Sequence, residues 1–253
     1  MSDVNLPSIK ERLWHSMRAD LSKFAPEIQD SQLLMCCTCG RLLPQEDFDL
    51  EHLVPQQALR ADPVDVRTNP ATPANVRAGN LLLCKKPLLY RNSPLYGNGC
   101  NSWKGRFYDK AITDIFTGKV NPDNRRARVN DTHITGCLAL AYLAMVAEFG
   151  YAVALMQSGR LLREQFFNPR KFHKQLGTRY QIVLVGSPAT DPEHQVWSKP
   201  FGFHFERGAC IVNVRSYVIT LPVSRDPRTP IAQHVKFVPS RFKLRPDFST
   251  SFR

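Results

Sequence analysis

The fold is decided by Cys36-Cys37-Thr38-Cys39 and the three segments that follow it: Glu51-His52-Leu53-Val54-Pro55, Asn80-Leu81-Leu82-Leu83-Cys84 and Cys100-Asn101-Ser102-Trp103-Lys104-Gly105. Two cysteines separated by two residues can grip one metal ion from a single turn, and a second pair completes a tetrahedral site. Cys84 and Cys100 are the nearest candidates for that second pair. The order of the segments therefore predicts a small fold organised around four cysteines.

The wide separation of Cys84 and Cys100 leaves two interpretations open. Usual pairs are two to four residues apart, so the intervening loop must bring these two cysteines together. Buried free thiols are the alternative, but an apolar environment alone predicts no such clustering. Cys37 could replace Cys36 as a ligand, and only the two-residue gap between Cys36 and Cys39 favours Cys36.

The cysteine content also bears on the compartment. Seven cysteines follow an N-terminus that has no basic segment and no apolar segment typical of secretion signals. Disulfides are rare in the cytoplasm. We therefore expect a cytoplasmic protein whose clustered cysteines bind metal, with Cys137 and Cys210 as core residues of apolar stretches.

The pair Glu51-His52 lies where a strand is expected to end. Residues 48–52 alternate like a strand, and Pro55 cannot continue the ladder. Adjacent side chains there diverge, so that one can bind a metal while the other faces a substrate. Histidine can take a proton from water near neutral pH, and a divalent cation can neutralise a phosphate. An isolated pair of this kind is more often an ordinary surface pair.

Together, the segments that begin at Glu51, Asn80 and Cys100 resemble the three blocks of the HNH endonuclease family. The resemblance covers residues 33–117. It implies a ββα-metal finger with a structural zinc, which hydrolyses phosphodiester bonds of DNA. The roles that it implies are His52 as general base, Asn80 as its orienting residue, Glu51 and Asn101 as ligands of a catalytic Mg²⁺ or Mn²⁺, and Cys36, Cys39, Cys84 and Cys100 as zinc ligands.

Three features depart from the family pattern. Glu51 stands where aspartate is common, and Asn101 stands where histidine is common, although asparagine also occurs there. The insertion between Cys84 and Cys100 is wide. A longer acidic side chain and a neutral amide ligand would alter the position and the affinity of the catalytic metal.

The chain divides into an N-terminal helix segment (1–30), the cysteine-bearing module (31–118), a polar linker (119–130) and a C-terminal domain (131–253). Apolar spacing predicts helices over 7–24, 102–117 and 131–149, the last capped by Asp131 or Thr132 and stopped near Gly150. Residues 63–75 show neither helical nor strand periodicity of apolar residues and are expected to form a loop.

The C-terminal domain is expected to be α+β with a mainly antiparallel sheet, which gives the whole chain an α+β class. Strands are predicted at 180–185, 201–206, 209–223 and 234–238, with a tight hairpin at Arg207-Gly208. Residues 137–156 are long and apolar enough to span a bilayer. Because Glu148 and many small residues dilute this stretch, we expect a core helix and no membrane association.

The charge favours a polyanionic partner. The net charge is +12; residues 1–130 carry 18 basic against 14 acidic residues (+4), so 131–253 carry 16 against 8 (+8). Candidate phosphate contacts are Lys104, Arg106, Arg170, Lys171 and Lys174. For Lys104 and Arg106 a solvated surface charge is an equal alternative, and the aromatic residues among 160–180 are predicted to be core.

The sequence thus predicts a metal-dependent endonuclease, in the manner of a restriction or phage-defence effector. Residues 131–253 would position the substrate, bind a protein partner or regulate cleavage. The alternatives are a zinc-stapled nucleic-acid-binding module without catalysis and a partner-binding subunit of a nuclease complex. The residues do not distinguish DNA from RNA as the substrate.

Overall fold

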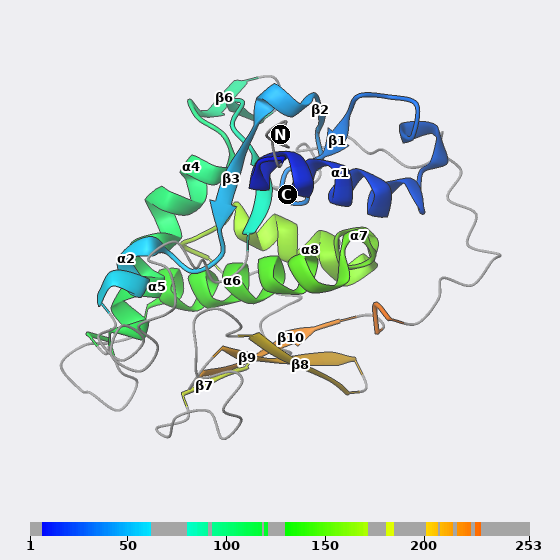
Figure 1. Cartoon of the computed structure of the whole chain (residues 1–253). Coiled ribbons are helices and arrows are strands. Elements are labelled where there is room, and N and C mark those ends of the chain that lie inside the picture. The colour runs from blue at the N-terminus through cyan, green and yellow to red at the C-terminus, as the bar shows by residue number, and fades with distance from the viewer. Residues whose placement is uncertain are drawn as a thin grey trace, which may run out of the picture. The chain divides into compact units, whose positions relative to one another are not determined.

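The computed structural model describes residues 7–61, 80–90, 93–117, 119–120, 130–171, 181–184, 201–206, 208–214, 217–223 and 226–228. They form a mixed structure of helices and antiparallel sheets, which confirms the predicted α+β class (Figure 1). The described residues belong to two compact units. The first contains 7–51 and 81–101, and the second contains 52–61, Asn80 and the residues from Ser102 onward.

The first unit begins with α1 (Ile9–Ser22), within the predicted range 7–24. A capping box fixes its start, because Ser8 Oγ accepts a hydrogen bond from Glu11 N and the Glu11 carboxylate accepts one from Ser8 N. On the buried side, the Trp14 ring packs edge-on against Phe48 with 5.7 Å between centroids. A 3₁₀ turn, Pro26–Ile28, follows the helix.

Short strands make up the rest of this unit. β1 (Leu34–Met35) and β2 (Leu42–Leu43) form an antiparallel pair, and a 3₁₀ turn (Gln45–Asp47) leads into β3 (Phe48–His52), the strand predicted at these residues. β3 pairs with β4 (Asn80–Cys84). The insertion before Cys100 contains an antiparallel hairpin, β5 (Leu88–Tyr90) and β6 (Ser93–Tyr96), where the sequence suggested only a loop.

The predicted helix 102–117 is a single helical run with an irregular centre. It comprises α4 (Cys100–Lys104), a π-helical turn (Gly105–Asp109) and α5 (Lys110–Phe116). The helix therefore continues past Gly105 through a π-helical turn. Helix α2 (Gln56–Ala61), which follows β3 in sequence, contacts α5.

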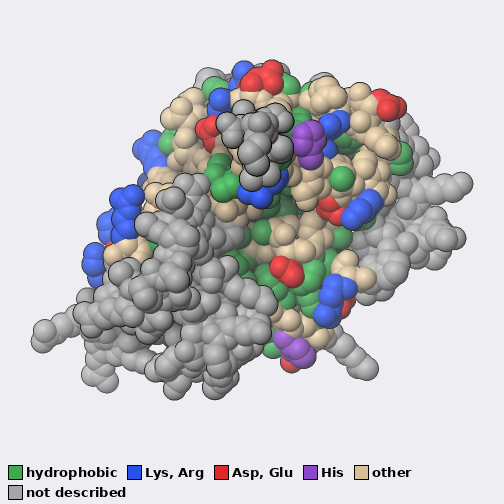
Figure 2. All heavy atoms as spheres, viewed as in Figure 1, with side chains coloured by type: hydrophobic (Ala, Val, Ile, Leu, Met, Phe, Trp, Pro, Cys, Tyr) green, Lys and Arg blue, Asp and Glu red, His purple; other side chains and the backbone are tan. Residues whose placement is uncertain are grey.

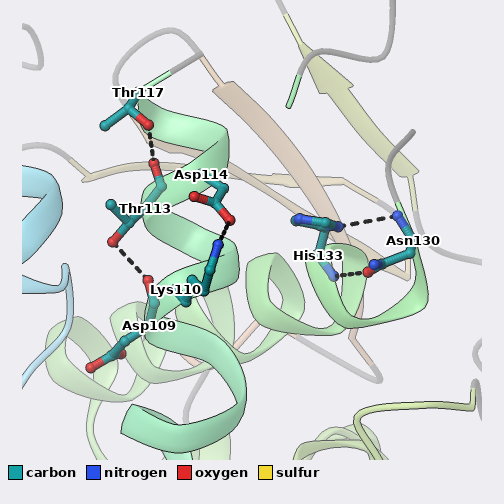
Figure 3. A network of polar contacts seen from close by, with 7 residues as sticks. All are labelled: Asp109, Lys110, Thr113, Asp114, Thr117, Asn130 and His133. Carbon is teal, nitrogen blue, oxygen red and sulfur yellow. Dashed lines mark hydrogen bonds and ion pairs between the residues drawn. The ribbon is translucent and has the colours of Figure 1, made fainter. Parts of the chain in front are cut away.

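Helix α6 (Asp131–Phe149) has the predicted bounds, but its cap differs from the prediction. Asn130, rather than Asp131 or Thr132, is the N-cap: its Oδ1 accepts from His133 N, and His133 Nδ1 accepts from Asn130 N (Figure 3). Asn130 is in extended backbone, which lets its side chain reach the first turn. The helix ends at Gly150, whose φ of 68° favours glycine.

Helix α6 is the core of the second unit. It is long and apolar enough to span a membrane. However, 72% of its most apolar 18-residue stretch is buried inside the fold, as expected for a core helix. α7 (Tyr151–Leu155) and α8 (Gln157–Phe166) pack beside it (Figure 1). Gly159 allows the close approach of these two helices, since a Cβ there would lie 2.0 Å from the Val153 carbonyl oxygen.

A four-stranded antiparallel sheet completes the second unit, in the order β7-β10-β9-β8. The strands are β7 (Gln181–Leu184), β8 (Phe201–Glu206), β9 (Ala209–Val214) and β10 (Tyr217–Pro222). Glu206 pairs with Ala209, which confirms the tight hairpin. The predicted strand 209–223 is two strands joined by a second hairpin, in which Val214 pairs with Tyr217. The predicted strand 234–238 and loop 63–75 lie outside the described residues.

The helix assigned to the cysteine module packs on the first helix of the predicted C-terminal domain. A Cβ on Gly136 of α6 would lie 3.4 Å from Ile112 and 3.8 Å from Ala111 of α5. α5 and α6 thus share one compact unit. The boundaries between the two compact units fall at 51/52, 80/81 and 101/102. Most of the predicted linker, 119–130, lies outside the described residues.

Candidate functional site

The first pair of cysteines lies on the turn that joins β1 and β2. Cys36 N donates to Arg41 O at 2.9 Å, and Gly40 N donates to Cys36 O at 2.7 Å. Gly40 has a φ of 71°, a left-handed conformation that glycine adopts without strain. The backbone therefore folds back on itself and turns the thiols of Cys36 and Cys39 inward, where both residues are fully buried.

Cys84 and Cys100 come from the end of β4 and the start of α4. A Cβ on Gly99 would lie 2.1 Å from the Cys84 carbonyl oxygen, so the chain entering α4 passes directly over the end of β4. The β5–β6 hairpin occupies most of the sequence between the two cysteines. Tertiary structure thus brings the two cysteines together across their wide separation in sequence.

Three thiols gather closely enough to hold a metal ion. The Sγ atoms of Cys36, Cys39 and Cys100 all lie within 4.8 Å of one another, and those of Cys36 and Cys100 are 3.9 Å apart. Two thiolates on one tetrahedral zinc are about 3.8 Å apart, as follows from a Zn–S distance of about 2.3 Å. Cys37 is buried but does not belong to this group, so the geometry favours Cys36 over Cys37 as the candidate ligand.

Cys84 adjoins the group of three. Its backbone N–H donates to Cys36 Sγ at 3.4 Å. Hydrogen bonds from the Cys100 and Cys39 thiols lower the pKa of Cys84 to about 4, whereas burial raises the pKa of Cys36 to about 11. Thiolates are the form that binds metal. The pKa is thus lowered for Cys84 and Cys39 and raised for Cys36 and Cys100, so the cluster combines thiols that favour the charged form with thiols that favour the neutral form.

Arg41 forms hydrogen bonds to two of the cysteines. Its Nη2 donates to Cys84 Sγ at 2.9 Å and its Nε donates to Cys39 Sγ at 3.5 Å. The same guanidinium donates to the carbonyls of Lys86 and Pro87. The Arg41 side chain thus joins the β1–β2 turn to the segment after β4 and places a positive charge beside two sulfur atoms.

Cys137 and Cys210 stand apart from this cluster. Both are buried, in α6 and β9, and burial raises the pKa of each thiol to about 12. A neutral thiol in an apolar setting behaves as a small hydrophobic side chain. Their predicted place in the core is confirmed.

Glu51 and His52 occupy the last two positions of β3. Glu51 is buried, and His52 is partly exposed. His52 Nε2 lies 3.3 Å from Gln56 Nε2 at the start of α2. Rotation of the Gln56 amide by 180° exchanges its donor and acceptor, so this contact suits either tautomer of the imidazole.

Asn80 and Asn101 begin the two elements that follow. Asn80 opens β4, the strand paired with β3, and its Oδ1 is buried with no hydrogen-bond partner among the described residues. Asn101 lies in the first turn of α4 and donates from Nδ2 to Leu50 O at 3.4 Å. This bond leaves the amide oxygen of Asn101 as the atom that could bind a cation.

The predicted phosphate contacts differ in their surroundings. Lys104 is fully buried, so its ammonium group is not presented to a phosphate in this structure. Arg106, Arg170 and Lys171 are exposed, and Lys174 lies outside the described residues. On the face drawn in Figure 2, charged side chains of both signs are interspersed with neutral ones. Phe166 and Phe167 are buried, as predicted for core residues.

Within the described ranges, the cysteines are the only group of three or more His, Cys, Asp or Glu side chains that gathers at metal-binding distance. The comparisons with known proteins add no relative. Neither a scan against protein-family models nor searches of curated proteins and of solved structures found a match to this chain.

Reasoning from sequence missed Gly40 and Arg41, and it named Gly99 only as part of the loop that must bring Cys84 and Cys100 together. Gly40 and Gly99 supply the turn and the close approach that bring the cysteines together, and Arg41 contacts two of the thiols. The two glycines each directly follow or precede a cysteine, a signal that the sequence offered. The contacts of Arg41 depend on the folded backbone and had no such signal.

Proposed function

We propose that the chain is a metal-dependent endonuclease of the HNH type that acts on DNA. The observation that carries the proposal is the gathering of Cys36, Cys39 and Cys100. Cys100 directly precedes Asn101, and Cys84, at the end of β4, is four residues from Asn80. A metal held by these cysteines would therefore fix two of the three sequence blocks that resemble the family.

The cysteine cluster fits a structural zinc with Cys36, Cys39, Cys84 and Cys100 as ligands. Soft thiolates are the ligands that zinc takes in closed tetrahedral sites. None of the seven cysteines forms a disulfide, which leaves their thiols available. Such an ion would contribute folding free energy to a unit of short strands.

The second group of candidates offers oxygen atoms. Glu51 has a buried carboxylate, and Asn101 retains its amide oxygen. These are ligands that Mg²⁺ or Mn²⁺ prefers, and such an ion would neutralise the phosphate and the leaving oxygen. His52, partly exposed at the end of β3, would take the proton from the attacking water, and Asn80 would orient the histidine.

Exposed cations of the second unit would bind the DNA backbone. Arg106, Arg170 and Lys171 are all exposed, and residues 131–253 carry the larger share of the net charge. Phosphate contacts of this kind position the substrate without reading its sequence. A restriction or phage-defence role, with a protein partner bound by the C-terminal residues, would be compatible with this arrangement.

A zinc-stapled binding module without catalysis is the second candidate. One observation favours it: among the described residues, no carboxylates and histidines gather into a second metal-binding group. In this case the protein would bind nucleic acid, or a nuclease partner, and cut nothing by itself.

Cleavage assays separate the two candidates. Purified protein is incubated with supercoiled plasmid, single-stranded DNA and RNA in Mg²⁺, Mn²⁺ or Ni²⁺, with EDTA as control. We expect metal-dependent cleavage of DNA that His52→Ala lowers by at least roughly a hundredfold, with zinc content and thermal stability unchanged.

Variants of the other candidate site residues should lose cleavage activity in a recognisable pattern. Excess Mg²⁺ should partly restore DNA cleavage by Glu51→Ala and Asn101→Ala, because these variants would lose metal affinity. It should not restore cleavage by His52→Ala. Asn80→Ala should show an intermediate loss. Equal cleavage by wild type and His52→Ala would remove these residues from the catalytic site and leave the binding module as the function.

A further inference from the structure

The ammonium group of Lys104 is buried at the end of α4. Its side chain has no exposed surface, and Nζ donates to the backbone carbonyl of His52 at 3.1 Å. Nζ also forms an ion pair with Asp109 Oδ1 at 2.6 Å. All three residues belong to the second unit. A buried charge of this kind is costly unless it is paired and hydrogen-bonded, and both conditions are met.

The irregular helix makes this pairing geometrically feasible. In a regular α-helix, residues five apart lie about 140° apart around the axis, so Lys104 and Asp109 would face different sides. The π-helical turn Gly105–Asp109 lies between them, and its hydrogen bonds join residues i and i+5. The helix is thus distorted at the place where Asp109 must turn toward Lys104. Such π-turns occur frequently at functional sites.

The carbonyl that Lys104 binds belongs to the residue proposed as general base. His52 is the last residue of β3, and beyond it no strand hydrogen bonds hold the chain before α2 begins at Gln56. A strand end is where backbone position is least constrained by the ladder. The bond from Lys104 supplies a constraint at that point, and the Gln56 amide contacts the imidazole itself.

We propose that Lys104 is a positioning residue for His52, and that its ion pair with Asp109 holds the ammonium group in place. The inference rests on the proposed nuclease function for its catalytic consequence, but the positioning itself does not depend on that function. It replaces the phosphate contact predicted from sequence, which requires an exposed ammonium group.

The two roles of Lys104 differ in their kinetic signatures. A positioning residue does not touch the substrate, so Lys104→Met should lower kcat by about 10- to 100-fold and leave KM and the salt dependence of DNA binding nearly unchanged. A phosphate contact would instead raise KM and reduce the salt slope by about one. The latter outcome would overturn the proposal.

A matched control lies on the same helical run. Lys110 is exposed and pairs with Asp114 at the regular i,i+4 spacing (Figure 3). Lys110→Met removes the same group from an ordinary surface ion pair, and we expect kcat and KM of the wild type. Asp109→Asn provides a milder test, because it keeps an oxygen acceptor for Lys104 and removes only the charge; its kcat should lie between those of wild type and Lys104→Met.

Nuclear magnetic resonance of ¹³C-labelled histidine tests the positioning without any cleavage. His52→Gln assigns the His52 ring signals. We expect Lys104→Met, and to a smaller extent Asp109→Asn, to shift or broaden these signals, while zinc content stays at the wild-type level and Lys110→Met leaves them unchanged. If wild type cuts no DNA, the nuclease proposal fails and this measurement still decides the positioning. Unchanged His52 signals in folded Lys104→Met and Asp109→Asn would refute it.

Discussion

The two compact units of this chain are held together in different ways. The first has strands of two to five residues, and buried cysteines from three separate segments meet inside it. The second is organised around the 19-residue helix α6, which is buried against α5, α7, α8 and β10. The comparison indicates that apolar burial around one long helix organises the second unit, whereas the first unit gathers thiols that could cross-link its segments.

A metal ion is the cross-link that the cysteines favour. Four thiols packed together without a metal would leave polarisable, partly charged sulfurs in a buried place, and Arg41 bridges two of them. We therefore expect the first unit to depend on zinc for its folding and the second unit to be indifferent to it.

The largest expected effect comes from removing one ligand. Cys100→Ser should lose about one zinc per chain and unfold the first unit, because one of the three closest thiols is replaced by a poor ligand. Elemental analysis and amide hydrogen exchange measure the two outcomes. Cys137→Ser, in the core of the second unit, should retain all the zinc. A folded, zinc-free wild type would contradict the difference drawn between the units.

A smaller effect is expected from Arg41. Arg41→Met keeps a long side chain but removes the charge and the hydrogen bonds to Cys84 and Cys39, so the zinc affinity should fall by about 10- to 100-fold, as for other groups that bond to metal ligands. Competition with a chromogenic chelator measures this affinity. Arg12→Met, an exposed change on α1, serves as the control. An affinity equal to that of wild type would show that Arg41 acts only on the loop carbonyls.

The second unit should respond to pH through the cap of α6. Burial lowers the pKa of His133 below its usual 6.5, opposed by Asp114 and reinforced by Lys110 (Figure 3). Because the unfolded chain then binds protons more readily, stability should be lost as the pH falls through 6.5 toward the lowered pKa of the folded state. Protonation of Nδ1 removes the acceptor of the Asn130 bond.

His133→Gln tests this cap, since glutamine accepts the same hydrogen bond without titrating. Denaturant unfolding between pH 7.5 and pH 5 should give a flatter stability profile for the variant. The difference is bounded by the worth of one helix cap, about 0.5–2 kcal/mol. Parallel profiles for the two proteins would exclude His133 as the source of any acid sensitivity.

The smallest effect concerns the DNA affinity of the two units. Replacing Arg170, Lys171 and Lys174 together by alanine should lower the salt slope of binding by up to about three, because fewer counterions are released. Cleavage at saturating DNA should survive. Alanine replacement of Arg12 and Lys23, exposed cations of the first unit, serves as a control that removes two charges. Equal slopes in all variants would mean that these charges only solvate the surface.

Several elements were predictable because their signals are local. The apolar spacing of α1, the bounds of β3 and of α6, and the hairpin between β8 and β9 all follow from neighbouring residues. Where two local signals competed, the prediction was less accurate. Asn130 capped α6 in place of Asp131 or Thr132, and the predicted strand 209–223 turned back to form two strands.

The sequence by itself determined which residues are candidates for chemistry: the cysteine spacing, the Glu51-His52 pair and the two asparagines were all evident from residue type and order. Only the tertiary structure decided which of them meet. It gathered Cys36, and not Cys37, with Cys39 and Cys100, placed Arg41 against two thiols and buried Lys104 against the carbonyl of His52. The physical reason is that such contacts join residues far apart in the chain, and their distances depend on how separate elements pack, which no local pattern encodes.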